Sequence, residues 1–157
     1  MRNSREVIKK DIQSKVVEIT RVTRVVAGGK RMRFRALVVV GDRKGRVGIG
    51  VKKGTDVAEA VAKATTEAKK MMITIPIVNQ TIPHMVKLKY KAARIIMKPG
   101  KPGRGIIAGG PVRAVVDLAG IKNVSCKMLG SSNKISNVRA AYLALQSFKN
   151  HAEPVQS

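Results

Sequence analysis

Three arginines at alternate positions are the residues of this chain whose spacing most clearly predicts a chemistry. Arg31, Arg33 and Arg35 lie within the stretch GKRMRFRALVVV, and each is followed by an apolar residue. Side chains along a β-strand point alternately to opposite faces, so this spacing predicts guanidinium groups on one face and an apolar row on the other. A guanidinium group binds two phosphate oxygens at once. The row therefore predicts a surface that binds the phosphate backbone of a nucleic acid.

More cations surround this row, and few acids balance them. A charge run is usually a solvated face, and that interpretation is kept for scattered lysines such as Lys69 and Lys70. The aligned arginines differ, because each phosphate that they neutralise adds a salt-dependent contribution to the affinity. The candidate RNA-binding cations are Arg21, Arg24, Lys30, Arg31, Arg33, Arg35, Arg43, Lys44, Arg46, Lys52 and Lys53.

The overall charge also indicates a polyanionic partner. The 157 residues include 32 Lys and Arg against 9 Asp and Glu, which gives a net charge of +23. Self-repulsion of this size destabilises a compact chain unless a polyanion offsets it. The 44% of hydrophobic residues allow a packed core, and no apolar run approaches the ~20 residues of a membrane-spanning helix. We therefore expect a folded protein that binds nucleic acid and has no membrane partner.

The scarcity of aromatic residues narrows this partner to structured RNA. The chain has no tryptophan, and its phenylalanines and tyrosines are Phe34, Tyr90, Tyr142 and Phe148. Proteins that read single strands stack bases on exposed aromatic rings, so such a platform is not expected. Recognition of folded RNA by its shape and phosphates remains. The single cysteine, Cys126, excludes an internal disulfide and fits a reducing compartment.

No arrangement of residues predicts catalysis, a metal site or a cofactor. The acids are scattered, and neither His84 nor His151 has neighbours at metal-ligand spacing. The glycines of GRVGIG (45–50) lie inside a predicted hairpin, where they suit a turn and a close backbone approach better than a phosphate loop. In GRGIIAGGPVR (103–113) the glycines precede a helix, as in kinases of the galactokinase–homoserine kinase type, but no catalytic aspartate is evident. A tight turn, an RNA phosphate and a neighbouring protein stay open as explanations of this loop.

The first part of the chain predicts a β-β-β-α unit. Its β-branched and alternating patterns predict antiparallel strands at 16–26, 31–40 and 46–52, the first two joined by a turn at 27–30. A helix follows, with Thr55 or Asp56 as N-cap and Glu59 in the capping-box position. The apolar stripe of this helix is Val57, Ala60, Val61, Ala64, Ala68 and Met71.

The second part of the chain predicts another α+β unit. Its predicted strands are 84–91, 93–98 and 121–129. The glycine- and proline-rich loop leads into a helix over 112–119, which has Pro111 in its first turn and ends at Gly120. Ser132 or Asn133 caps a last helix. The expected buried residues of that helix are Val138, Ala141, Tyr142, Leu145 and Phe148.

The predicted fold class is therefore α+β, in two small domains. The expected boundaries are a flexible extension at 1–11, an RNA-binding domain at 12–76, a linker at 77–83, an α+β domain at 84–150 and a tail at 151–157. A domain of about 65 residues buries roughly 60% of its unfolded surface and is marginally stable by itself. We expect mutual packing of the two domains, or bound RNA, to supply the remaining stability.

Two parts of the sequence resemble the bacterial-type small-subunit ribosomal protein five family. They are RVVAGGKRMRFRALVVVGDRKGRVGIGVKKGTDVAEAVAKA and GIIAGGPVRAVVDLAGIKNV with the later KMLGSSNKISNVRAAYLAL, and the match runs from Val16 to Leu145. The resemblance implies an N-terminal domain similar to double-stranded-RNA-binding domains and a C-terminal α+β domain with a left-handed βαβ crossover. It also implies a structural, non-enzymatic protein of the cytoplasmic ribosome.

The resemblance further implies which residues contact RNA. The loop from Ala27 to Arg31, which contains Gly28 and Gly29, is expected to reach into 16S ribosomal RNA near the hinge between the head and body of the small subunit. Arg21 and Lys30 are expected to lie near the point where messenger RNA enters. These roles add the two turn glycines to the candidate RNA-binding residues.

Protein partners are also implied by the resemblance. Gly105 and Arg113 mark the expected contact with small-subunit protein four, and another part of the C-terminal domain contacts protein eight. Family members influence decoding accuracy through the contact with protein four. No cofactor is expected. An RNA-processing or ribosome-assembly factor, for instance the protein subunit of ribonuclease P, is the alternative function.

Overall fold

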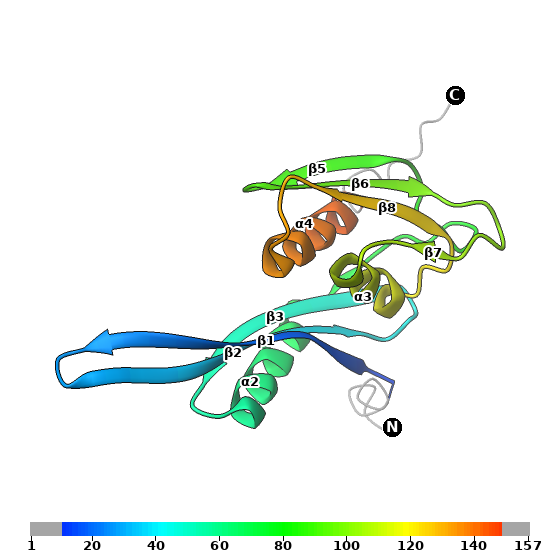
Figure 1. Ribbon diagram of the computed structural model, residues 1–157. Coiled ribbons are helices and arrows are strands. Elements are labelled where there is room, and N and C mark those ends of the chain that lie inside the picture. Colours follow the sequence, from blue (N-terminus) through cyan, green and yellow to red (C-terminus); the bar gives the residue numbers. More distant parts are fainter. Residues whose placement is uncertain (1–10, 149–157) are drawn as a thin grey trace, which may run out of the picture.

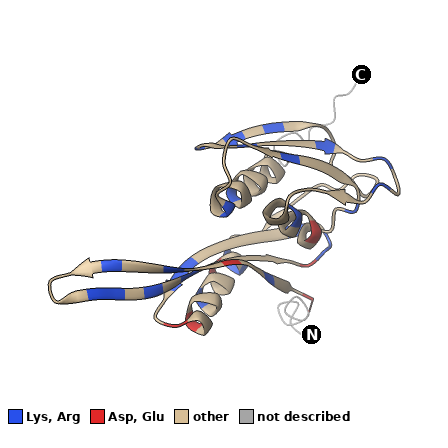
Figure 2. Ribbon diagram, viewed as in Figure 1, with Lys and Arg blue, Asp and Glu red and all other residues tan. Residues whose placement is uncertain are grey.

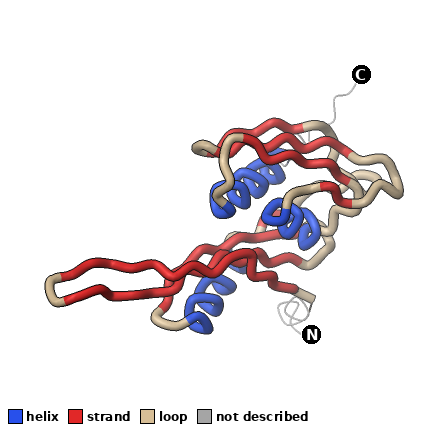
Figure 3. The backbone as a smooth tube through the Cα atoms, in the orientation of Figure 1, coloured by secondary structure: helices blue, strands red, loops and turns tan. Residues whose placement is uncertain are grey.

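The structure is a computed structural model that describes residues 11–148. Helix α2, a first sheet, helices α3 and α4 and a second sheet follow one another as layers (Figure 1, Figure 3). The N-terminal β-β-β-α unit and the C-terminal α+β unit confirm the predicted fold class. The expected extension at 1–11 lies outside the described residues except for Asp11, and so does the expected tail at 151–157.

The first sheet is an antiparallel meander with one short additional strand. Its strands are β1 (Gln13–Val26), β2 (Gly29–Gly41), β3 (Arg46–Gly54) and β4 (Ile73–Thr74). They are hydrogen-bonded in the order β1-β2-β3-β4. The first three strands were predicted from their β-branched and alternating residues, whereas β4 was not predicted. A strand of two residues is too short to show a period of two.

Strands β1 and β2 form a long hairpin whose outer half projects beyond the helices (Figure 1). Its ladder ends with Val26 opposite Gly29, so the turn consists of Ala27 and Gly28 and is shorter than the predicted turn at 27–30. Gly28 and Gly29 have φ values of 113° and 147°. Residues that carry a side chain rarely adopt backbone angles in this left-handed region, so glycine suits both positions.

Helix α2 (Val57–Lys70) begins at a carboxylate cap. Of the two predicted N-caps, Asp56 is the cap, and its side chain accepts a hydrogen bond from the first N–H of the helix. Glu59 accepts hydrogen bonds from the N–H and the hydroxyl of Thr55, each at 2.6 Å. Hydrogen bonds from Lys63 and Thr55 lower the pKa of Glu59 to about 2. Both acids also lie favourably at the positive end of the helix dipole.

Helix α2 packs very closely on one face of the first sheet. The residues of this small core are Ala36, Val38 and Val40 of β2 and Ala60, Ala64 and Ala68 of α2. A Cβ atom at Gly50 would overlap the carbonyl group of Ala64, and one at Gly48 would overlap that of Ala68. The glycines of GRVGIG therefore permit the close backbone approach predicted for them.

The second sheet is mixed, and helices α3 (Gly110–Ala119) and α4 (Lys134–Ser147) lie between it and the first sheet (Figure 1). Its strands are β5 (Val86–Tyr90), β6 (Ala93–Pro99), β7 (Ile106–Ile107) and β8 (Val124–Leu129), in the order β5-β6-β8-β7. Strand β7 pairs in parallel with β8, so β7, α3 and β8 form a βαβ unit. The sequence predicted a structured loop where β7 lies, because this strand also has only two residues and shows no period.

The two helices of the second unit begin and end at predicted signals. Pro111 lies in the first turn of α3, and Gly120 ends that helix with a φ of 88°. The N-cap of α4 is Asn133, whose side chain accepts a hydrogen bond from the N–H of Ile135 at 3.1 Å. Of the two residues predicted as the N-cap of this helix, Ser132 and Asn133, the cap is Asn133.

The two domains share one hydrophobic core. On the face opposite α2, the sheet residues Leu37, Val39 and Val47 are buried against helices α3 and α4. The helix residues of this core include Val112, Val115, Val116, Leu118, Val138, Ala141 and Leu145. Mutual packing therefore supplies part of the stability that each small domain lacks.

The connection between the domains is anchored rather than loose. Residues 78–81 form a tight turn with Asn79 and Gln80 at φ values of 49° and 63°. The carbonyl of Gln80 accepts hydrogen bonds from the N–H groups of Lys122 and Asn123. Ile82 is buried in the shared core. The predicted linker thus fixes the C-terminal domain to the sheet.

Tyr142→Phe is expected to lower the free energy of unfolding by about 1 kcal/mol. The Tyr142 hydroxyl donates a 2.7 Å hydrogen bond across the domain interface to the carbonyl of Met71, and burial raises the pKa of this phenol. Met71 is 54% exposed, so water can replace the lost donor and limits the cost. Urea unfolding measures the effect. An unchanged unfolding midpoint would contradict a stabilising role for this bond.

Candidate nucleic-acid interface

The face of the first sheet that packs on α3 and α4 divides into an apolar half and a cationic half. Residues directly opposite each other on neighbouring strands share a face. Arg24 of β1 lies opposite Arg31, and Lys53 of β3 lies opposite Arg35. Arg33 continues the same alternation, which runs on into the buried Leu37 and Val39. We call Arg24, Arg31, Arg33, Arg35 and Lys53 the arginine face.

The arginine face surrounds a hollow. A cavity of about 410 Å³ is lined by Val22, Thr23, Arg24, Val26, Arg31, Arg33 and Lys53. The alternation predicted the arginines of this site, whereas it did not predict that Val22, Thr23 and Val26 of β1 also line the hollow. Their contribution depends on the register of the hairpin, which sequence spacing did not specify. The hollow is open, cationic and lacks an aromatic ring among its lining residues.

Like charges face each other directly on the arginine face. Arg24 is opposite Arg31, and Arg35 is opposite Lys53. Like-charged pairs in these positions destabilise a sheet. Within residues 11–148, no ion pair joins any of these side chains to an acid. The arrangement is therefore unfavourable for the isolated protein and favourable once an anion lies between the guanidinium groups.

Other predicted cations lie on the opposite face of the hairpin. Arg21 is paired with Phe34, and Phe34 packs toward α2. Lys30 is paired with Val25, which is 76% exposed near the hairpin turn. Lys52 also belongs to this side and forms a 3.1 Å ion pair with Glu67 of α2. The hairpin therefore presents cations on both of its faces, and Figure 2 shows Lys and Arg along both of its strands.

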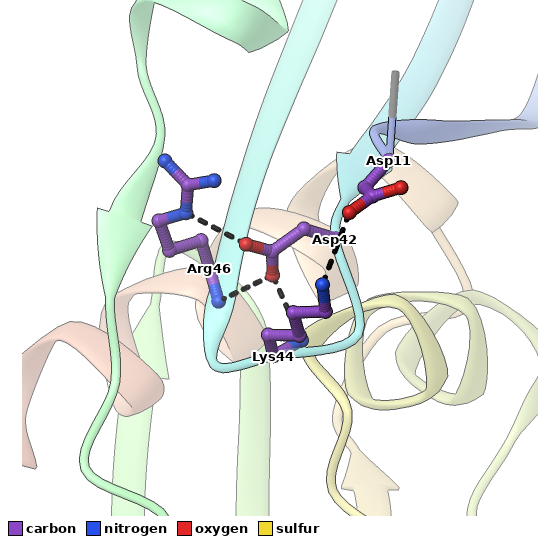
Figure 4. Close-up of polar contacts among 4 residues, drawn as sticks. All are labelled: Asp11, Asp42, Lys44 and Arg46. Carbon is purple, nitrogen blue, oxygen red and sulfur yellow. Dashed lines mark hydrogen bonds and ion pairs between the residues drawn. The ribbon is translucent and has the colours of Figure 1, made fainter. Parts of the chain in front are cut away.

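The remaining predicted cations lie at the far end of the sheet, where acids neutralise them. Arg46 contacts Asp42 at 2.7 Å and Lys44 contacts Asp11 at 3.0 Å (Figure 4). Arg43 contacts Asp117 of α3 at 3.5 Å. The three cations of the β2–β3 turn therefore form ion pairs within the protein, and they lie away from the arginine face.

The β2–β3 turn also caps helix α3. The N–H of Arg43 donates to the carbonyl of Leu118, and the N–H of Gly45 donates to that of Ala119. These carbonyls belong to the last turn of the helix, where partners within the helix are lacking. A Cβ atom at Gly41 would overlap the backbone of Leu118, so the turn and the helix are in close contact.

Asp42→Asn is expected to lower the free energy of unfolding at pH 7 by about 1–3 kcal/mol. Burial raises the pKa of this carboxyl, but hydrogen bonds from the Arg46 side chain and from the N–H groups of Lys44 and Arg46 outweigh it and lower the pKa below its ordinary value of 3.8. A lowered folded-state pKa stabilises the protein above the unfolded-state pKa, and this contribution disappears as the pH falls through the folded-state pKa. The two proteins should therefore converge in stability below pH 3.8. A difference that is independent of pH in acid unfolding experiments would contradict this role.

The residues expected to contact a neighbouring protein lie together at one end of the C-terminal domain. Gly105 precedes β7, has a φ of 75° and donates its N–H to the side chain of Asn123 at 3.1 Å. Arg113 of α3 lines a cavity of about 320 Å³ with Ile106 and other residues of this end. Ile107 is 48% exposed beside them. The same cavity is also lined by Arg43, Asp117 and Lys122, so this end combines exposed apolar area with charges of both signs.

The described part of the chain gives little support for a metal site, a reactive cysteine or a membrane-spanning helix. Among residues 11–148, no group of three or more His, Cys, Asp or Glu side chains is placed to hold a metal ion. Burial raises the pKa of Cys126 to about 12, so this thiol is not a nucleophile at neutral pH. The described helices include none that is both long and apolar enough to cross a membrane.

Comparison with known proteins agrees with this architecture. Residues 12–76 match the family described as "Ribosomal protein S5, N-terminal domain", and residues 88–156 match "Ribosomal protein S5, C-terminal domain". "Small ribosomal subunit protein uS5c" of Rhodomonas salina is 48% identical over 93% of this chain and 88% of that protein. The protein of the same name from Guillardia theta is 49% identical over 90% of this chain and 84% of its own length. That from Spinacia oleracea is 45% identical over 97% of this chain and 50% of its own length. The chain therefore belongs to the ribosomal protein S5 family.

Proposed function

We propose that this protein is a structural, non-enzymatic constituent of the small ribosomal subunit that binds 16S ribosomal RNA through the arginine face. The observation that carries the proposal is the direct opposition of like charges in the first sheet, with no acid among residues 11–148 paired to them. RNA phosphates placed in the hollow offset this repulsion and accept charge-assisted hydrogen bonds from the guanidinium groups. The protein then works in the cytoplasm as part of the ribosome.

The proposed contact is to phosphates and RNA shape rather than to stacked bases. Phe34, the ring closest in sequence to the arginines, is half-buried and packs against the core under α2. The turn at Gly28 and Gly29 is open, since a Cβ atom at either position would have no neighbour within 4 Å. A tip this narrow fits into a groove of folded RNA.

The opposite face of the hairpin is proposed to lie near the incoming messenger RNA. Arg21 and Lys30 are on this face, so the hairpin separates them from the arginine face by its own thickness. This arrangement lets one hairpin contact ribosomal RNA on one side and messenger RNA on the other. Both contacts are electrostatic and therefore depend on salt.

Contacts with protein four and protein eight of the small subunit complete the proposal. The end that carries Gly105, Ile107 and Arg113 combines exposed apolar area with charge, which suits a protein neighbour. Protein eight is assigned to another part of the C-terminal domain. If the contact with protein four forms in one state of the subunit and opens in another, its strength sets the balance between decoding states.

Sedimentation of the tagged protein through a sucrose gradient in high salt tests the proposed function. A structural constituent should sediment with mature small subunits at one copy per particle. An RNA-processing or assembly factor should be released by salt or should accompany precursor particles only. Either of these two results would contradict the proposal.

A further inference from the structure

The outer face of the second sheet carries a second cluster of cations. Residues Leu88, Ile95, Met97 and Cys126 of this sheet point inward to α3 and α4. The residues that alternate with them face away from the helices. Those with charge are Lys87, Lys89, Arg94, Lys98 and Lys127, all of them exposed (Figure 2). We call these five residues the lysine face.

Among the residues that the structure describes, no acid neutralises the lysine face. In the sequence between residues 84 and 148 the only acid is Asp117, which lies on α3 and contacts Arg43. Within residues 11–148, no ion pair involves a member of the lysine face. These cations are therefore balanced by solvent ions unless a partner covers them.

The strand register places like charges against each other here too. Lys89 lies directly opposite Arg94, and Ile96 lies between Lys87 on one neighbouring strand and Lys127 on the other. Opposed like charges destabilise a sheet, and stability alone therefore does not account for them. The same feature marks the arginine face, where Arg24 opposes Arg31.

From this repetition we propose that the lysine face is a second RNA-binding surface, which binds the sugar–phosphate backbone of folded RNA independently of the hairpin. The inference rests on the proposed function and extends it to the C-terminal domain. The two surfaces belong to different sheets, with α3 and α4 packed between these sheets and the hairpin projecting beyond them (Figure 1), so we expect the two surfaces to contact different RNA segments. Bridging two segments would fix their relative position.

The chemistry of the lysine face favours RNA over an acidic protein. Lysine is depleted in protein–protein interfaces relative to the rest of the surface, whereas it serves phosphate backbones as a mobile point charge. The apolar residues on this face are few: Ile96 is half-buried and Leu129 is 40% exposed. Tyr90 points inward and accepts a hydrogen bond from Arg139, so it offers no ring for base stacking. Phosphate contact without base recognition is what these side chains allow.

Directed cleavage of RNA in assembled small subunits tests the inference. An iron chelate that generates hydroxyl radicals is attached to the full chain carrying Lys89→Cys or Lys127→Cys, and the labelled proteins are incorporated into small subunits. Val26→Cys, in the hollow of the arginine face, tests the proposed function in parallel. Cys126 is buried with a pKa raised to about 12, so the native thiol escapes labelling, and the unsubstituted chain is the control.

Cleavage of 16S RNA from the lysine-face positions, at sites that differ from those cut from Val26→Cys, is the expected result. Cleavage from Val26→Cys alone would overturn the inference and leave the proposed function intact. Cleavage from none of the positions would overturn both. Cross-linking of the lysine-face cysteines to a ribosomal protein, without cleavage of RNA, would identify a protein as the partner and also overturn the inference.

A charge variant measures the strength of the contact. Lys87→Gln, Lys89→Gln and Lys127→Gln combined should lower the salt slope of binding to small subunits that lack this protein by about 2 to 3, at 0.7–0.9 per phosphate contact. Lys15→Gln, Lys69→Gln and Lys70→Gln remove the same charge from exposed positions outside both surfaces. An equal change in the two variants would show that only net charge matters and would overturn the inference.

Discussion

Replacing Arg24, Arg31 and Arg33 with glutamine is expected to lower the affinity for 16S ribosomal RNA at least about a hundredfold, because charge-assisted hydrogen bonds contribute about 1.5–3 kcal/mol each. The slope of log affinity against log salt concentration should fall by about 2 to 3, at 0.7–0.9 per lost phosphate contact. Stability should not fall. The three side chains are exposed, and their removal relieves the repulsion between Arg24 and Arg31.

Filter binding of protein-free 16S RNA at several salt concentrations, together with thermal unfolding, measures these effects. The variant with Lys15, Lys69 and Lys70 replaced by glutamine has the same net charge and is the matched control. It should keep most of the affinity. Unchanged RNA affinity of the arginine variant combined with a lower melting temperature would mean that these arginines are structural.

Gly50→Ala is expected to lower the free energy of unfolding by about 3 kcal/mol or more, at or above the upper end of ordinary overpacking. The added methyl group would overlap the carbonyl of Ala64 in α2, and this backbone cannot move aside by changing a rotamer. Helix α2 would have to shift away from β3. The core beneath it consists mainly of alanine and valine, so little apolar contact remains to hold a displaced helix.

Gly110→Ala is the matched control for this glycine. It lies in the first turn of α3, and a Cβ atom there would have no neighbour within 4 Å. Its φ is outside the left-handed region, so alanine should be neutral or stabilise the protein by less than about 1 kcal/mol. Urea unfolding of the two variants measures the change in unfolding free energy that each substitution causes. Equal stability of Gly50→Ala and the parent protein would contradict the close packing of α2.

Much of the fold follows from local patterns that the sequence displays. The alternation around Arg33 predicts both the strand and its cationic face, because a period of two is specific for strands. The cap at Asp56 and the stop at Gly120 mark helix ends through chemistry that needs no distant partner. Strands β4 and β7 could not be predicted from the sequence in this way, because two residues are too few to show a period.

The division of the cations among separate places does not follow from local patterns. Arg43 and Asp117 are 74 positions apart in the chain and meet only because the β2–β3 turn caps α3. Strand pairing decides that Arg24, and not Arg21, shares a face with Arg31 and Arg33 of the neighbouring strand. The lysine face did have a local signal, since Lys87 and Lys89 alternate with apolar residues as the arginines do. Its opposed charges became visible only through the pairing of three strands.

The central claim is that RNA neutralises the arginine face, and arginine-selective chemical modification tests it most directly. Free protein and assembled small subunits are treated with phenylglyoxal, and each arginine is quantified by mass spectrometry. We expect Arg24, Arg31 and Arg33, which are exposed in the protein, to react when it is free and to be protected in the subunit. Nuclease digestion of the RNA should restore their reactivity. Full reactivity of the three arginines in the intact subunit, or protection that persists after digestion, would contradict the account.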